Sequence, residues 1–152
     1  MKRFFACERG AAAVEAAIIV PVLLSLGLGA AETGNLVNET HKMKAGLASG
    51  ARLLARAPAP APASVETEAL NLAVTGSIDG SLPARLPGWR TSQVTVSYRF
   101  VDNSGGLYTG GDQIRIVRLD SSRPYVGLRL LTLGGDITIR ASHEERWTGG
   151  GG

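Results

Sequence analysis

The chain has 152 residues, a formal net charge of +3 and a single cysteine, Cys7. This length gives no reason to expect two independent domains, and one cysteine excludes an internal disulfide. The first ten residues carry +2 of the net charge, through Lys2, Arg3 and Arg9 against Glu8. The other basic residues are scattered, without the clustered patch that nucleic-acid binding needs. Composition therefore predicts a small single-domain protein that does not bind nucleic acid.

The N-terminal segment holds the most informative pattern. A basic leader, residues 1–10, ends in Gly10, and residues 11–31 form an apolar run that is long enough to span a bilayer core as a helix. Glu15 interrupts the run near its start, where an ionised carboxylate costs roughly 2.5–3.5 kcal/mol on insertion scales. A passive anchor has no use for this group. Cleavage after Gly10 would leave a free amine on Ala11, one helical turn from Glu15.

Three other interpretations of the N-terminus remain open. An ordinary secretory signal would be cleaved after the apolar run, and residues 28–30 offer the small side chains for that. A lipoprotein signal would use Cys7, but only six residues precede it. In a simple membrane anchor, Glu15 would be hydrated among the lipid headgroups.

The same segment resembles the TadE-like family, the minor pseudopilins of the tight-adherence (Flp-type) pilus system. The resemblance rests on residues 9–15, on Pro21 within the apolar run and on the sequence Ala-Glu-Thr-Gly at 31–34. It implies that a prepilin peptidase cleaves between Gly10 and Ala11, and that Glu15 guides subunit registration. It also implies that Pro21, Glu32 and Gly34 mark the membrane helix.

Beyond the apolar run, residues 32–57 are predicted to continue as an amphipathic stem helix. The apolar stripe follows 4-3-4-3-4 spacing: Leu36, Thr40, Met43, Leu47, Gly50 and Leu54, flanked by Val37. Glu39 and most other charged residues occupy the remaining faces. Gly46 and Gly50 mark either a close contact or a fraying helix end. Residues 58–64, in which proline and alanine alternate as far as Ala63, predict an extended linker of polyproline II type.

Residues 65–148 are predicted to form an α+β domain. Ser64 is the expected N-cap of a short helix that ends near Gly76. Alternating segments predict strands at 94–100, 113–119 and 137–142, with the first two forming a hairpin. In the first strand, the buried face should carry Val94, Val96, Tyr98 and Phe100. The stretch 124–133 is apolar but of undecided type, and residues 149–152 predict a flexible tail.

The predicted fold class is therefore α+β: a long membrane-spanning helix, its amphipathic stem and a small antiparallel sheet packed on that stem, as in pilins. No convincing active site accompanies it. Ser142, His143 and Glu144 are adjacent on a strand and point to alternate faces, although Asp136 or Glu145 could act as outside partners. The stretch 102–106 predicts a hairpin turn rather than a calcium loop. We expect no catalytic activity, no cofactor and no metal.

The functional prediction is a minor pseudopilin with its N-terminus in the cytoplasm and its domain in the periplasm. Basic residues in the leader favour this orientation in the inner membrane. Its expected partners are the prepilin peptidase, other pilins and pseudopilins, the pilus assembly platform and the lipid bilayer. One alternative is an unprocessed single-pass envelope protein with a partner-binding outer domain. A second alternative is a hydrolase that uses His143.

Overall fold

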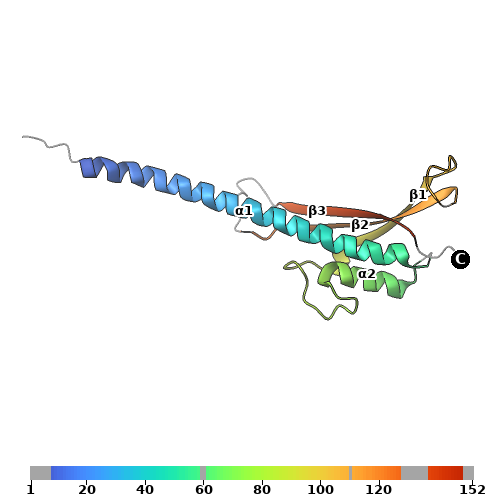
Figure 1. The fold of residues 1–152 in the computed structure, drawn as a ribbon. Coiled ribbons are helices and arrows are strands. Elements are labelled where there is room, and N and C mark those ends of the chain that lie inside the picture. The colour runs from blue at the N-terminus through green and yellow to red at the C-terminus, as the bar shows by residue number, and fades with distance from the viewer. Residues whose placement is uncertain (1–7, 59–60, 110, 128–136, 149–152) are drawn as a thin grey trace, which may run out of the picture.

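The computed structural model describes residues 8–58, 61–109, 111–127 and 137–148. It contains a long helix with a second helix and a three-stranded antiparallel sheet packed along its C-terminal half (Figure 1). The predicted α+β fold class is confirmed. Most of the predicted leader, the greater part of the stretch 124–133 and the predicted tail 149–152 lie outside the described residues.

Helix α1 runs from Glu8 to Arg56 over 49 residues. Pro21 lies inside the helix and does not end it. The predicted stem stripe is confirmed, because its side chains from Met43 to Leu54 are buried against the domain. Val37, which was expected to flank this stripe, is the exception, since it is 47% exposed.

Helix α2, Ala63–Thr75, packs beside α1. The predicted N-cap at Ser64 is wrong, because the cap is Pro62 and its carbonyl accepts the backbone N–H of Glu66 at 3.1 Å. The extended backbone of Pro62, with φ −60°, already suits the residue that precedes a helix. The predicted end is confirmed, since Gly76 closes the helix in the left-handed conformation with φ 85°.

Two glycines of α1 allow the helices to approach closely. A Cβ added at Gly50 would lie 2.6 Å from the carbonyl oxygen of Ala69, which is too close for any real contact. A Cβ at Gly46 would meet the carbonyl oxygen of Ala73 and the ring of Trp89. The close-contact interpretation of these glycines is therefore the one that the structure supports.

Replacing Gly50 with alanine should destabilise the fold by about 1–3 kcal/mol, because the added methyl group overpacks the interface between the helices. Gly34→Ala is the matched control, since a Cβ there meets nothing within 4 Å. The control should be neutral or gain up to about 1 kcal/mol from helix propensity. Denaturant unfolding of the full chain in detergent, followed by tryptophan fluorescence, measures both variants. Equal stability of the two variants would contradict the proposed close packing.

The sheet has the order β1-β2-β3, formed by Val94–Asp102, Gln113–Pro124 and Thr138–Arg146. The predicted hairpin is confirmed, since β1 and β2 pair antiparallel without a bulge from Val94↔Ser121 to Asp102↔Gln113. Strand β2 continues five residues beyond its predicted end at 119, because the polar stretch that follows still pairs with β3.

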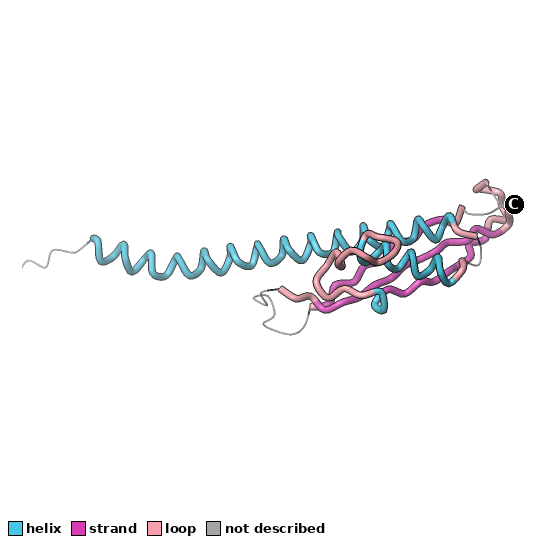
Figure 2. The backbone as a smooth tube through the Cα atoms, turned by 90° about the horizontal axis from the view of Figure 1, so that it is seen from below, coloured by secondary structure: helices cyan, strands magenta, loops and turns pink. Residues whose placement is uncertain are grey.

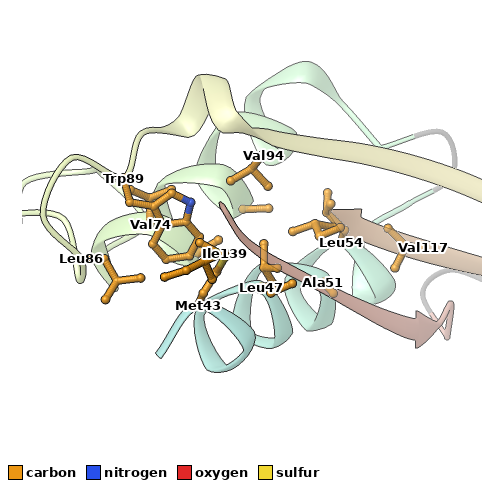
Figure 3. Close-up of a cluster of buried hydrophobic side chains, with 14 of the residues drawn as sticks. Met43, Leu47, Ala51, Leu54, Val74, Leu86, Trp89, Val94, Val117 and Ile139 are labelled. Atoms are coloured by element: carbon orange, nitrogen blue, oxygen red, sulfur yellow. The ribbon is translucent and has the colours of Figure 1, made fainter. Parts of the chain in front are cut away.

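The core lies between the sheet and the two helices (Figure 3). Its largest fully buried side chain is Trp89, which comes from the loop after α2. The indole Nε1 of Trp89 donates to the Ser121 hydroxyl at 2.9 Å, and that hydroxyl donates to the carbonyl of Gln93 at 2.9 Å. The loop is thus fastened to β2 from within the core, and every polar group in this chain of bonds has a partner.

Strand β1 does not bury the face that its alternation predicts. Val94 is buried and Val96 is half-buried, but Tyr98 is 40% and Phe100 57% exposed. The reason is geometric: β1 is an edge strand, and its second half reaches past the C-terminal end of α1 (Figure 1). The prediction of a fully buried face is therefore wrong for Tyr98 and Phe100.

Candidate functional site

The N-terminal half of α1 stands clear of the rest of the molecule (Figure 2). Within the described residues, one helix is long and apolar enough to cross a membrane, and none of its apolar window is buried by the domain. Large aliphatic side chains from Val14 to Leu28 are between 44% and 65% exposed. Transfer of each such side chain out of water contributes roughly 1.5–3 kcal/mol. This surface has the properties of a single membrane-spanning helix.

The predicted processing residues lie in the first turns of α1. The helix begins at Glu8, so the bond between Gly10 and Ala11 falls within helical backbone. Glu15 is exposed at the front of the apolar segment. Positions 11 and 15 are four residues apart and therefore share one face of the helix. An amine at the start of residue 11 would lie one turn from the Glu15 carboxylate, and the attraction between such charges grows as the dielectric falls.

The predicted membrane-helix residues are spread along α1 rather than gathered. Pro21 lies in the middle of the apolar segment, and a Cβ at Gly34 would meet nothing within 4 Å. Glu32, by contrast, is only 3% exposed. At 1.5 Å per residue, the helix rises about 31 Å between Ala11 and Glu32, which is close to the thickness of a bilayer core. Glu32 therefore lies where a spanning helix would emerge.

The chain after β2 contacts α1 at this point. The Tyr125 hydroxyl donates to the backbone carbonyl of Glu32 at 3.3 Å, and the side-chain amide of Asn35 donates to the Tyr125 oxygen at 3.2 Å. Tyr125 itself is only 7% exposed. The aromatic ring thus ties the domain to the helix at the predicted membrane boundary.

One turn further along α1, a buried ion pair joins the stem to the sheet. The guanidinium of Arg123 in β2 donates to the Glu39 carboxylate at 3.1 Å, and the two side chains are 2% and 9% exposed. Arg123 also donates from Nε to the carbonyl of Pro124 at 3.3 Å. We refer to Glu39, Arg123, Asn35 and Tyr125 together as the junction clasp.

Sequence reasoning missed the junction clasp. It assigned Glu39 to the exposed faces of the stem and ended the second strand before Arg123. The partners of the ion pair are 84 positions apart, so no local pattern connects them. The signal that the sequence offered was Arg123 itself. It alternates in phase with Val117 and Leu119 and therefore lies on the same face of the strand as these two residues.

The other candidate groups form ion pairs and turns. His143 and Glu145 lie 3.1 Å apart on the face of β3 opposite to Ser142, and Arg52 of α1 lies 3.9 Å from Glu145. Asp136, a possible partner, lies outside the described residues.

The Asp102 carboxylate accepts hydrogen bonds from the Ser104 hydroxyl and backbone, and these bonds lower its pKa. The predicted turn at 102–106 is confirmed.

The N-terminal region also matches a known family. Residues 10–52 match the model of the TadE-like protein family. This segment of the chain is similar to the TadE-like family. The match begins at Gly10, includes Glu15 and Glu32, and lies entirely within α1. The resemblance predicted from the N-terminal residues is therefore confirmed. Comparisons with curated proteins and with solved structures give no match.

Proposed function

We propose that this chain is a minor pseudopilin that assists the assembly of a tight-adherence (Flp-type) pilus. The observation that carries the proposal is the uncovered apolar half of α1 with Gly10 and Glu15 at its front, inside the region of the family match. A prepilin peptidase would cleave after Gly10, where the absence of a side chain leaves room for the enzyme at the backbone. The mature chain would begin at Ala11.

Glu15 would then guide the subunit into register. In the bilayer core its carboxylate is costly as a lone charge. A free Ala11 amine, its own or that of a neighbouring pilin, would neutralise it, and a low dielectric makes this attraction strong. The pairing therefore favours a defined axial position as a subunit leaves the membrane for the filament.

The topology follows from the charge of the leader. Lys2, Arg3 and Arg9 favour a cytoplasmic N-terminus, which puts the sheet domain in the periplasm. The protein would then reside in the inner membrane, beside the pilus assembly platform. Its place in the cell would be the machinery for adhesion and surface colonisation.

The stem keeps one face available for other subunits. The domain covers the stripe from Met43 to Leu54, whereas a second stripe of α1 remains exposed. This uncovered stripe consists of Gly34, Asn38, His41, Ala45 and Arg52. Lateral packing with other pilins would use it together with the apolar segment below. The junction clasp supports this role because it holds the domain on the opposite face.

Replacing Gly10 with leucine should block processing and reduce surface pili to the level of a deletion strain. The added side chain would obstruct the peptidase at the residue that precedes the cleaved bond. Gly29→Leu is the matched control, because its Cβ meets nothing within 4 Å and an apolar side chain there suits the bilayer. The control should be processed normally. Immunoblots of the chain and counts of surface pili measure both effects. Normal piliation with Gly10→Leu would favour an unprocessed single-pass envelope protein instead.

A further inference from the structure

A cavity lined by two arginines lies beside the junction clasp. Its volume is about 340 Å³, at the small end of the roughly 300–1,000 Å³ that ligand sites occupy. The loop before β1 and the end of β2 supply its lining, which includes Arg90, Ser92, Gln93, Arg123, Pro124 and Val126. Neither aspartate nor glutamate is among the described residues that line it. We refer to this space as the arginine cavity.

The buried guanidinium of Arg123 has hydrogen-bonding capacity that the fold does not use. Its Nη2 donates to the Glu39 carboxylate and its Nε to the Pro124 carbonyl. Its Nη1 is buried and has no hydrogen-bond partner within the described part of the chain. A buried donor without a partner costs free energy, and the cost is larger for a charged group. An acceptor bound in the arginine cavity and in contact with Nη1 would remove this cost.

Arg90 supplies the second positive charge. Its side chain is exposed and forms no ion pair with any residue that the structure describes. Its backbone is held in place, because its N–H donates to the Gln93 side chain at 2.9 Å and its carbonyl accepts the Gln93 N–H at 3.0 Å. Guanidinium groups present planar forks of N–H donors that suit phosphate and carboxylate oxygens. Two of them around one cavity without an acid are the chemistry of an anion site.

The arginine cavity lies at the level of the lipid headgroups. Glu32 marks the point where the spanning helix would emerge from the bilayer core. From there to Glu39, the partner of Arg123, the helix rises about 10 Å. The headgroup region extends roughly 5–8 Å beyond the hydrocarbon core on each side. The cavity therefore lies at the outer edge of this region, within reach of headgroup phosphates.

Exposed apolar surface connects the arginine cavity to the spanning segment. Val126 lines the cavity and is 69% exposed. The same residue borders a second hollow of about 440 Å³, which Ala31, Glu32 and Tyr125 also line. Tyrosine is enriched where proteins meet the membrane–water interface. A molecule with a phosphate at one end and an apolar chain at the other would occupy both hollows, whereas a free phosphate would use only the first.

We propose that the arginine cavity binds the headgroup phosphate of an anionic phospholipid, from the leaflet on the domain's side of the membrane. Arg90 and the Nη1 group of Arg123 donate to the phosphate oxygens, and the apolar part of the lipid lies against Val126. The bound lipid fixes the depth of the domain at the bilayer surface. This site requires that α1 spans the membrane, but it does not depend on processing at Gly10 or on pilus assembly.

Native mass spectrometry of the full chain in detergent tests the site, with phosphatidylglycerol and phosphatidylcholine as probes. We expect one tightly retained phosphatidylglycerol and weaker retention of phosphatidylcholine, whose choline cation already neutralises its phosphate. Arg90→Gln should lower the affinity for phosphatidylglycerol at least about tenfold, since it removes a charge-assisted hydrogen bond. Arg56→Gln is the matched control, because it makes the same charge change at an exposed residue in the last turn of α1. Equal affinity of the two variants would overturn the proposal.

A double variant tests Arg123 without leaving Glu39 as a lone buried charge. Arg123→Met with Glu39→Met keeps the net charge of the chain and removes the guanidinium. It should also lower the affinity for phosphatidylglycerol at least about tenfold, because the phosphate loses a charged donor. Tryptophan fluorescence checks that the variant is folded. Binding as in the wild type would overturn the assignment of Arg123 to the site.

Inorganic phosphate distinguishes a lipid site from a site for a free anion. An excess of inorganic phosphate should leave phosphatidylglycerol bound to the wild-type chain, since the lipid also contacts the apolar surface at Val126. Displacement of the lipid by inorganic phosphate would overturn the lipid assignment and indicate a site for the free anion.

Discussion

Replacing Glu15 with alanine should leave processing intact and abolish pilus assembly. The variant loses the carboxylate that would pair with an Ala11 amine, and removal of one partner of a buried ion pair costs about 3–5 kcal/mol. That cost corresponds to more than a hundredfold in an equilibrium constant for subunit association. Surface pili should therefore fall by at least about that factor. Counting pili by electron microscopy and capturing neighbouring pilins by co-purification measure the effect.

The same substitution should not weaken membrane insertion. Insertion scales assign roughly 2.5–3.5 kcal/mol to a charged residue within a spanning helix, so Glu15→Ala makes α1 a better anchor. The amount of variant in the membrane is the control and should be undiminished. Glu15→Asp, which keeps the charge on a shorter side chain, should retain part of the assembly. Unchanged piliation with Glu15→Ala would remove the proposed role of the carboxylate in registration.

Replacing Arg123 with methionine should destabilise the domain by about 3–5 kcal/mol, because it leaves the Glu39 carboxylate buried without its cation. Arg123 is 2% exposed and its partner lies on the stem, so the loss acts directly on the contact between sheet and helix. A fold of this size is stable by only about 5–15 kcal/mol, so the effect is a large part of the total. Denaturant unfolding of the full chain in detergent measures it.

The matched control for this pair is the double variant, Arg123→Met with Glu39→Met. Replacing both members of a buried ion pair with apolar residues of similar volume is often neutral or stabilising. The double variant should therefore recover most of the stability that Arg123→Met loses. If both variants were equally unstable, volume and packing would explain the loss, and the ion pair would not be what matters at this junction.

Much of the fold could be predicted from local patterns. The stem stripe repeats with helical spacing, so the buried side of α1 could be assigned before any contact was known. Gly76 marked the end of α2, and the alternation of 94–100 and 113–119 indicated the hairpin. Gly46 and Gly50 pointed to a close contact, although the identity of the contacting helix came only from the structure.

The remainder depended on contacts between distant parts of the chain. The pairing of Glu39 with Arg123 joins positions 84 residues apart, and Tyr125 contacts Glu32 over 93 positions. No periodicity connects such residues. The exposed rings of Tyr98 and Phe100 could not be predicted either, since alternation reports that a strand has an apolar face but not whether a helix reaches far enough to cover it.

The candidate site divides in the same way. Gly10 could be singled out because it directly precedes the apolar segment, and Glu15 and Pro21 because each departs from the residues around it within that segment. The burial of Glu32 could not be predicted, because Tyr125, which contacts it, lies 93 positions further along the chain. The function proposed for the N-terminal half of α1 thus rests on its own sequence, whereas the junction clasp depends on the assembled fold.

The intact mass and the N-terminal residue of the protein, purified from membranes with and without the cognate prepilin peptidase, test the proposed function most directly. We predict a chain that begins at Ala11 when the peptidase is active and at Met1 when it is absent. A start at Met1 in both cases would contradict the pseudopilin account and indicate a plain membrane-anchored protein. A start near residue 30 would contradict it in another way, since the apolar segment would then be an ordinary signal peptide.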